Sequence, residues 1–577
     1  MGSYNLPSKE SFVVMDKNGS IISTDDEEEW TTDDEASETE IHQSQEQAAN
    51  DIEVQPEREK TPIIHSQYLY QIPKVNISES HMPLSPPPQT EKQSDEQVLQ
   101  DYYDSYADKY IEFMSNNPTT YHVITHFKSL LTNNGFTYVK ENELFRKLDP
   151  GFYFTSKDDQ TLIAFVIGGK WEPSQGSCFI ASHCDALSIK LNPKGSIKKH
   201  IEDYELLGVA PYSGSLNDLW LNRDLGLAGA ILVKDTKTSK VSRKLINSSP
   251  HPIGFIPQLA PHFGIEKTYN KQTEMVPIVS YSSDKGLSPT DEEKASVVYG
   301  KHPLSLLRYV SELSSTSLTN IVQLDLDLVD VQPAARGGVG NEFIYSSSLD
   351  DRLCSFDSIY GLIEFSQAFL TDRDINEYDG LNGIYLANNE EIGSATRTGA
   401  AGGFLIDTLK SVVSSRSKEN AVEQVLELTN NTILLSTDVT HAFNPNFKDA
   451  YLEKNFPLPN TGPSIKLDSN GHVLSDSIAD SFLQSIISKN LPDITLQHFH
   501  IRNDGRSGGT IGPIMSNGRR GINGAKLIID VGLPILSMHS IRSTMGYKDV
   551  GIGIRFFREV FNKWQEEIKS FDLEKSS

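Results

Sequence analysis

Five short apolar segments, distributed between residues 162 and 531, constrain the fold of this chain more than any other feature of its sequence. Each has the length and the apolar content of a buried strand rather than of a helix. Amphipathic segments with helical spacing alternate with them, and this alternation predicts an α/β domain. The expected strands are residues 162–167, 178–181, 384–387, 432–436 and 527–531, and the expected helices include 122–131, 352–370, 475–491 and 550–571.

A change in the sequence pattern divides this domain. Between about residues 190 and 340 the apolar runs become shorter and Pro and Gly more frequent, as around 230–233 and 273–279. Such a pattern is typical of a β-rich domain. We therefore expect one α/β domain, formed by residues 99–189 and 343–577, with a β-rich domain inserted over residues 190–342. A chain of 577 residues is long enough for this organisation.

Residues 1–98 form an acidic extension of different composition. The first 100 residues contain 21 acidic and 6 basic residues, a net charge of −15 out of −26 for the whole chain. The charge runs and the prolines at 86–88 predict a disordered segment, because such a composition buries too little apolar surface to fold. It is either a solubilising tail or a segment for partner binding or targeting. In the second case its apolar island at 68–72 would be the contact point.

The composition also excludes several classes of protein. A net charge of −26 argues against nucleic acid and anionic membrane as partners. No apolar run approaches the roughly 18–20 residues of a membrane-spanning helix, so membrane insertion is not expected. Three cysteines cannot form a disulfide framework in so long a chain. This indicates synthesis and folding in a reducing compartment, the cytoplasm.

Acidic residues and histidines cluster near the ends of the expected strands, where α/β enzymes place their active sites. Taken singly, each has an ordinary explanation. A His-x-Asp triplet arises by chance, an aspartate before a helix can be its cap, adjacent glutamates are common on surfaces, and an isolated histidine is more often structural. The candidates are His183 with Asp185, Asp350 with Asp351, Glu390 with Glu391, Asp438 with His441, and His539.

Taken together, these residues predict a dinuclear metal centre. Two histidines, two aspartates and one glutamate match a two-zinc site with open positions for water and substrate. The second glutamate of the adjacent pair would then take a proton from the attacking water.

The order of the motifs strengthens this prediction. H-x-D, L-D-D-R, N-E-E-I-G-S, S-T-D-x-x-H-A, N-D-x-x-x-G-G-T-I-G-P and L-S-M-H-S-I-R follow one another along the chain. This series resembles the M18 family of metallo-aminopeptidases, and within it the fungal vacuolar branch, over roughly residues 100–570. The resemblance implies a zinc-aminopeptidase catalytic domain, with a mixed sheet flanked by helices, and an inserted β-rich dimerisation domain.

The resemblance also implies roles for individual residues. One Zn²⁺ would be held by His183, Asp350 and Asp438, and a second by Asp350, Glu391 and His539, which makes two zinc ions per subunit. Glu390 would be the general base, Asp185 would orient His183, and His262 would reach the active site of a neighbouring subunit and stabilise the oxyanion there. One departure concerns Asn388, which stands where the family usually has Asp.

The implied function is hydrolysis of N-terminal, Leu-like neutral residues from peptides, although other branches of the family prefer Asp and Glu. The implied assembly is a homo-oligomer of twelve subunits, synthesised in the cytoplasm and delivered to the vacuole with the help of an autophagy receptor. Two alternatives stay open. One is another dinuclear exopeptidase, such as a carboxypeptidase or deacylase. The other is a self-assembling autophagy-type cargo or scaffold protein whose catalysis is secondary or lost.

Overall fold

The computed structural model describes residues 94–571, except 145, 197–200, 265–268, 282–287, 417–419 and 518–519. The expected disordered extension therefore lies outside the described residues, apart from its last five. Of those five, Ser94 caps helix α1 (Asp95–Asn116) with its side chain, and the other four are the first residues of that helix. Among the described helices, none is both long enough and apolar enough to cross a membrane.

A nine-stranded mixed sheet organises the catalytic part of the described chain. Its strand order is β1-β2-β3-β14-β4-β15-β19-β17-β18. The central strands β14, β4, β15 and β19 are parallel neighbours, whereas β2 against β3, β3 against β14, and β17 against β19 are antiparallel. The strands are β1 (Thr137–Tyr138), β2 (Gly151–Lys157), β3 (Thr161–Ile167), β4 (Cys178–His183), β14 (Leu381–Ala387), β15 (Ile433–Thr437), β17 (Ser464–Leu467), β18 (Gln497–His500) and β19 (Leu527–Gly532).

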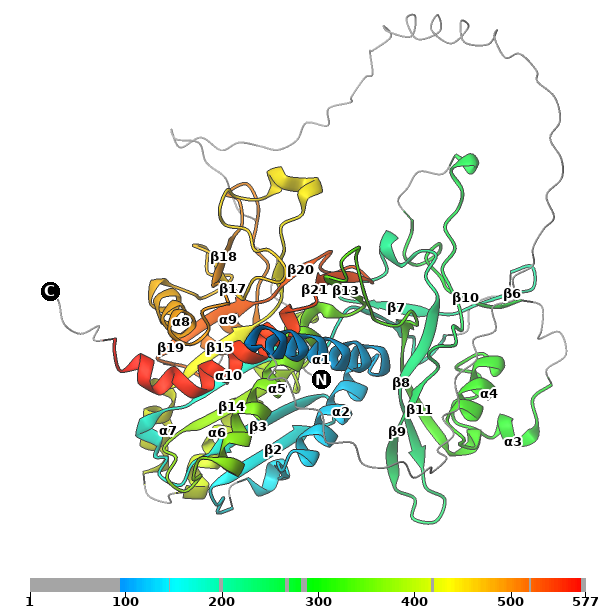
Figure 1. Ribbon diagram of the computed structural model, residues 1–577. Coiled ribbons are helices and arrows are strands. Elements are labelled where there is room, and N and C mark those ends of the chain that lie inside the picture. Colours follow the sequence, from blue (N-terminus) through cyan, green and yellow to red (C-terminus); the bar gives the residue numbers. More distant parts are fainter. Residues whose placement is uncertain are drawn as a thin grey trace, which may run out of the picture. The chain divides into compact units, whose positions relative to one another are not determined.

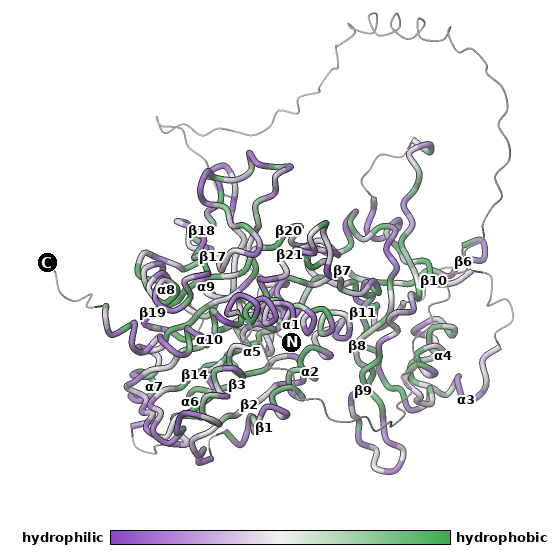
Figure 2. Tube along the Cα trace, in the orientation of Figure 1, coloured by the Kyte–Doolittle hydropathy of each residue, from purple (hydrophilic) through white to green (hydrophobic). Residues whose placement is uncertain are grey.

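Helices cover both faces of this sheet (Figure 1). Alternate residues of β3 show why, because Leu162, Ala164 and Val166 belong to one apolar core and Ile163, Phe165 and Ile167 to the other. Figure 2 shows the corresponding hydrophobic colouring along the central strands. One core includes α1, α2 (Thr120–Asn133), α5 (Leu349–Thr371), α8 (Ser477–Asn490) and α10 (Asp549–Ile568); the other includes α6 (Phe404–Arg416), α7 (Ala421–Asn430) and α9 (Ile511–Asn517). The predicted mixed sheet flanked by helices is confirmed.

The inserted part is built on a separate five-stranded antiparallel sheet with its own apolar core. Its order in space is β7-β5-β11-β8-β9. The strands that come first and last along the chain, β5 and β11, are neighbours in this sheet, and Lys190 of β5 pairs with Asp327 of β11. The strands are β5 (Ser188–Leu191), β7 (Val209–Tyr212), β8 (Leu225–Lys234), β9 (Val241–Asn247) and β11 (Ile321–Asp330), accompanied by the pair β6 (Tyr204–Leu206) and β10 (Ile278–Tyr281) and by α3 (Asp291–Lys294) and α4 (Leu304–Leu313).

Two strands lie near the expected boundaries of the inserted part, residues 190 and 342. Strand β5 already begins at Ser188. Strand β12 (Ala335–Gly337) pairs with β13 (Phe343–Ser346), which belongs to a sheet of the catalytic part. The apolar run at 273–279 forms a strand only from Ile278, directly after Pro277. A proline lacks the N–H that a strand ladder requires, which accounts for this late start.

A third sheet brings distant segments of the catalytic part together. Its order is β12-β13-β21-β20-β16, with β13 (Phe343–Ser346), β21 (Ser543–Gly546), β20 (Pro534–Leu536) and β16 (Thr440–His441). Strand β13 leads into α5, β16 follows Asp438, and the β20–β21 connection carries His539. The sheet therefore gathers three of the expected metal ligands from residues almost 200 positions apart.

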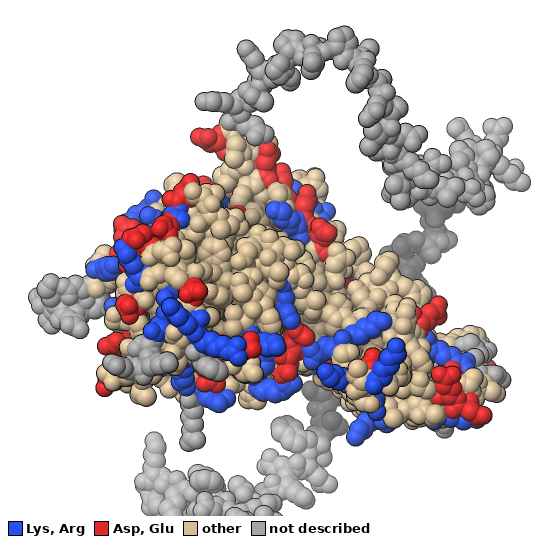
Figure 3. Space-filling view, turned by 90° about the horizontal axis from the view of Figure 1, so that it is seen from below, with Lys and Arg blue, Asp and Glu red and all other residues tan. Residues whose placement is uncertain are grey.

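Charged side chains are mixed on the face of the molecule that Figure 3 shows. Lys and Arg alternate there with Asp and Glu around a wide area that few charged residues interrupt. No single sign of charge dominates this face.

Asp357 of α5 is an acid inside the core. Its side chain is fully buried beside Gly553 of α10, and neither of its carboxylate oxygens has a hydrogen-bond partner among the described residues. Burial, reinforced by the neighbouring Asp549 and Asp351, raises the pKa of Asp357 well above its usual value. The folded state therefore holds this side chain in its neutral form.

Asp357→Asn is expected to stabilise the protein increasingly as pH rises. In the wild type, the contribution of Asp357 is fully present below its unfolded pKa of about 3.9 and is lost as pH rises through its raised folded pKa. Asparagine does not ionise, so between the unfolded pKa and the raised folded pKa the difference in free energy of unfolding should grow by about 1.4 kcal/mol per pH unit and then level off. Urea unfolding at several pH values measures this slope. A difference independent of pH would contradict a neutral Asp357, and Asp372→Asn, at the exposed end of the same helix, is the matched control.

Candidate metal centre

Acidic and histidine side chains lie at the carboxyl ends of the parallel strands, at one edge of the central sheet. Strand β4 ends at His183, β15 is followed directly by Asp438, and β14 is followed by the turn that carries Glu390 and Glu391. His183 pairs in register with Ala387, four residues before Glu391. The carboxyl ends of adjacent parallel strands thus bring the segments together, as expected for an α/β active site.

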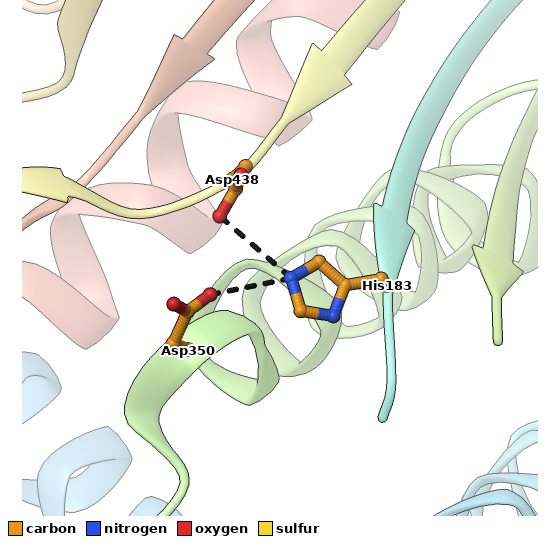
Figure 4. A group of neighbouring side chains, drawn as sticks. All are labelled: His183, Asp350 and Asp438. Carbon is orange, nitrogen blue, oxygen red and sulfur yellow. Dashed lines mark hydrogen bonds and ion pairs between the residues drawn. The ribbon is translucent and has the colours of Figure 1, made fainter. Parts of the chain in front are cut away.

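His183, Asp350 and Asp438 form the first group of potential ligands (Figure 4). The Nε2 atom of His183 lies 3.2 Å from Asp350 Oδ1 and 3.8 Å from Asp438 Oδ1. Figure 4 shows the three side chains converging from the end of β4, the start of α5 and the segment after β15. Their potential ligand atoms all lie within 4.8 Å of one another.

Asp350, Glu391 and His539 form the second group. The Nε2 atom of His539 lies 3.3 Å from Asp350 Oδ2 and 4.0 Å from Glu391 Oε2. His539 has a positive φ of 62° on the β20–β21 connection, and its side chain is 59% exposed. Asp350 belongs to both groups, with one carboxylate oxygen facing each histidine.

Asp185 contacts one residue of each ligand group. Its Oδ1 lies 3.4 Å from His183 Nδ1 and accepts a hydrogen bond from the Glu390 backbone N–H at 3.1 Å. Its Oδ2 accepts from the Glu391 backbone N–H at 3.2 Å and from the Tyr212 hydroxyl at 2.8 Å. One buried carboxylate therefore fixes the turn that carries two glutamates and lies beside the His183 ring, whose Nδ1 is also hydrogen-bonded with the main-chain carbonyl oxygen of Asp185 at 3.1 Å.

The electrostatics of the centre favour a bound cation. Burial, together with neighbouring aspartates, raises the pKa of Glu390 to about 7 and that of Glu391 to about 8. The hydrogen bond to Asp350 raises the pKa of His539 to about 9. Carboxylates that are buried this close together repel one another, which disfavours their charged forms. A cation between them would relieve this repulsion.

The donor set fits zinc. Oε1 of Glu391 is buried and has no hydrogen-bond partner among the described residues, so it is available as a ligand. Imidazole nitrogens and carboxylate oxygens are ligands that Zn²⁺ accepts. The structure thus brings together all five residues expected as ligands.

Two neighbours of the ligand groups were not foreseen from the sequence. Lys466 of β17 is buried with its Nζ 3.5 Å from Asp438 Oδ2, and Tyr212 comes from β7 of the inserted part. Neither carries a motif that sequence reasoning could have used. His441, noted in the sequence beside Asp438, is exposed and belongs to neither ligand group.

The side chain of Asn388 is hydrogen-bonded to residues that belong to neither ligand group. Its Nδ2 donates to Gln160 Oε1 at 2.9 Å and to Thr398 Oγ1 at 3.2 Å. An amide serves this position because it can donate to both acceptors, whereas a carboxylate would need both partners to donate instead.

His262 lies on an exposed 3₁₀ helix of the inserted part, η4 (Pro261–Phe263), and belongs to neither ligand group. Two of its neighbours, Leu259 and Phe263, are exposed apolar residues, the latter at 69%.

A cavity of about 230 Å³ adjoins the second ligand group. It lies between the catalytic part and the inserted part. Asp350, Glu391 and His539 contribute to its wall from one side, and Trp220 and Asp327 from the other.

Comparison with known proteins identifies relatives over most of the chain. Residues 113–561 match the family described as aminopeptidase I zinc metalloprotease (M18). The chain is similar to vacuolar aminopeptidase 1 of Saccharomyces cerevisiae, with 40% identity over 82% of this chain and 91% of the relative. It is also similar to aspartyl aminopeptidase 4 of the same yeast, with 30% identity over 80% and 95% of the two chains.

Solved structures share the fold. The mApe1 dodecamer of Saccharomyces cerevisiae superimposes with a TM-score of 0.73, at 38% identity over 82% of this chain and all of that chain. The structure of the Ape4 and Nbr1 complex superimposes with a TM-score of 0.75, at 28% identity over 83% and 89% of the two chains.

Proposed function

The chain belongs to the M18 family of zinc metallo-aminopeptidases, and on that premise we propose that it is a dinuclear zinc enzyme that removes neutral, Leu-like residues from the N-termini of peptides. One observation carries the dinuclear assignment. Asp350 belongs to two groups of ligands, with a separate carboxylate oxygen towards His183 and towards His539. Asp350, His183 and Asp438 would hold one ion, and Asp350, Glu391 and His539 would hold the other.

Glu390 is the general base in this proposal. It is half-buried, next in the chain to the ligand Glu391, and its backbone is fixed by Asp185. When bound, zinc supplies a lowered pKa for the attacking water and polarisation of the scissile carbonyl. Glu390 accepts a proton from that water and transfers it to the amine of the departing peptide. Asp185 keeps the His183 ring oriented during the cycle.

A homo-oligomer, and specifically a dodecamer, is the proposed assembly, by analogy with the mApe1 dodecamer. Exposed apolar residues around η4 and the area of few charges in Figure 3 support an interface, since interface cores are depleted of charge. The relationship to a vacuolar aminopeptidase supports synthesis in the cytoplasm followed by delivery to the vacuole. The complex of a family member with Nbr1 supports an autophagy receptor as partner.

The alternative of a cargo or scaffold with lost catalysis is less well supported. Loss of activity usually leaves ligand positions replaced or dispersed, whereas all five are filled and close together here. Because the relatives include an aspartyl aminopeptidase, acidic N-terminal residues are the main competing substrates.

Zinc removal and a substrate panel test this function. Peptides and amides that begin with Leu, Ala, Asp, Glu or Lys should be hydrolysed with a preference for Leu, and N-acetyl-Leu substrates should not react. A chelator should abolish turnover and added Zn²⁺ should restore it. Turnover that survives complete zinc removal would overturn the metal assignment. Hydrolysis of blocked substrates would instead indicate another class of exopeptidase, and faster cleavage of Asp or Glu would overturn the preference.

A further inference from the structure

The carboxylate of Asp185 is the point where several parts of the active site meet. It accepts hydrogen bonds from two backbone N–H groups of the Glu390–Glu391 turn and faces Nδ1 of His183. Its remaining partner is the Tyr212 hydroxyl, at 2.8 Å from Oδ2. Asp185 itself is 2% exposed, so these protein groups, rather than solvent, determine where its carboxylate lies.

Tyr212 reaches this point from the inserted part of the chain. It is the last residue of β7, its side chain is 8% exposed, and its backbone N–H donates to Ser215 Oγ. Ser215 in turn donates to the Ser188 carbonyl oxygen on β5. The backbone of Tyr212 is thus tied to the sheet of the inserted part, while its hydroxyl lies in the catalytic part.

The Tyr212 hydroxyl makes a second contact. It accepts a hydrogen bond at 2.8 Å from Nδ2 of Asn389, the residue that precedes Glu390. Asn389 has a positive φ of 58° and starts the 3₁₀ helix η6 (Glu390–Ile392). One hydroxyl therefore donates to the support of His183 and accepts from the turn that carries both glutamates.

A separate chain of hydrogen bonds joins the inserted part to the same turn. Asp325 of β11 accepts from the Tyr121 hydroxyl at 2.7 Å, and that hydroxyl accepts from Gln160 Nε2 at 2.5 Å. Gln160 Oε1 accepts from Asn388 Nδ2 at 2.9 Å. Hydrogen bonds thus connect the turn from Asn388 to Glu391 with the inserted part in two ways. One runs through Gln160 and Tyr121, and the other through Tyr212.

We infer that Tyr212 is a positioning residue, through which the inserted domain holds Asp185 and the Asn389–Glu391 turn in the geometry needed for zinc binding and proton transfer. This inference rests on the proposed function of His183, Glu390 and Glu391. It assigns the inserted domain a part in the chemistry of its own subunit, in addition to any part in assembly. Partners of this kind, one step removed from a metal ligand, typically change metal affinity or activity by about 10- to 100-fold when they are removed.

Tyr212→Phe is the direct test, because it removes one oxygen atom and keeps the ring. We expect zinc affinity, measured by competition with a chromophoric chelator, to fall by about 10- to 100-fold, and kcat at saturating zinc to fall by a similar factor. KM and the oligomeric state should stay unchanged. The matched control is Tyr204→Phe on β6 of the same domain, where the ring is 43% exposed, and it should match the wild type in every measurement.

A double-mutant cycle distinguishes positioning from general destabilisation. If Tyr212 acts through Asp185, Tyr212→Phe should have little further effect on zinc affinity in an Asp185→Asn background, because interacting residues are not additive. Independent, additive losses would overturn the inference. Should Tyr212→Phe fail to fold, Asn389→Gly removes the other partner of the hydroxyl while allowing the positive φ, and it should lower kcat without changing KM.

The outcomes separate this inference from the proposed function. A wild-type protein without chelator-sensitive aminopeptidase activity would overturn the proposed function. An active, zinc-dependent wild type with a Tyr212→Phe variant of equal zinc affinity and kcat would leave the proposed function intact and overturn only the role of Tyr212.

Discussion

Glu390→Gln is expected to lower kcat by several orders of magnitude while zinc content stays close to that of the wild type. General acid–base catalysis contributes about 100- to 10,000-fold, and the amide cannot accept the proton of the attacking water. Zinc content should persist because Glu390 belongs to neither group of ligands. Single-turnover rates and metal analysis of the purified variant measure the two quantities separately.

Glu391→Gln is the matched comparison, since it makes the same chemical change one residue later. Glu391 belongs to the second ligand group, so this variant should lose zinc as well as activity. Turnover of Glu390→Gln close to that of the wild type would exclude Glu390 as the base. Loss of zinc from both variants to the same extent would show that the two glutamates had been assigned incorrectly.

The second large effect is expected at His262. A donor directed at a developing oxyanion is typically worth about 100- to 1000-fold in kcat, so His262→Ala should lower kcat by that factor and leave zinc content and assembly unchanged. The exposed position of His262 on η4, outside both ligand groups, is compatible with a role in a neighbouring subunit. His251→Ala, at another exposed histidine of the inserted part, is the control and should retain full activity.

Complementation tests whether His262 acts between subunits. Glu390→Gln subunits and His262→Ala subunits, each inactive alone, are mixed and allowed to exchange. If His262 acts in trans, some interfaces combine an intact base with an intact neighbouring histidine, and part of the activity should return. Absence of recovery after demonstrated exchange would place His262 in the site of its own subunit or outside any site.

Much of the fold and of the two candidate ligand groups could be predicted because their signals are local in sequence. The central strands are continuous apolar runs, and the predicted 162–167 differs from β3 (Thr161–Ile167) by one residue. The ligands stand directly after such runs, as His183 and Asp438 do, and parallel strands bring their carboxyl ends to one edge. The motif order then predicted which of these residues would hold the same ion.

The supporting residues could not be predicted because their partners are set by tertiary contacts. Tyr212 stands in an unremarkable segment, 27 positions after Asp185, and only the packing of the inserted part brings its hydroxyl to that carboxylate. In the sequence, Lys466 is a single lysine in a short apolar segment. Its position beside Asp438 is evident only in the structure, where the segment forms β17. Neither contact has a spacing or composition that a sequence pattern could reveal.

The pairing of β5 with β11 means that the chain leaves the catalytic domain and returns to it at neighbouring points. Lys190 and Asp327 are paired, so their Cα atoms are separated by only roughly 5 Å. Domains with adjacent ends can be added to or removed from a host fold with little strain, and a turn of a few residues could close this gap. A protein shortened in this way would keep its central sheet and its two candidate ligand groups, yet Asp185 and Asn389 would each lose their hydrogen bond with the Tyr212 hydroxyl. The excised module would therefore have to be replaced by a loop that offers one hydroxyl at the same place.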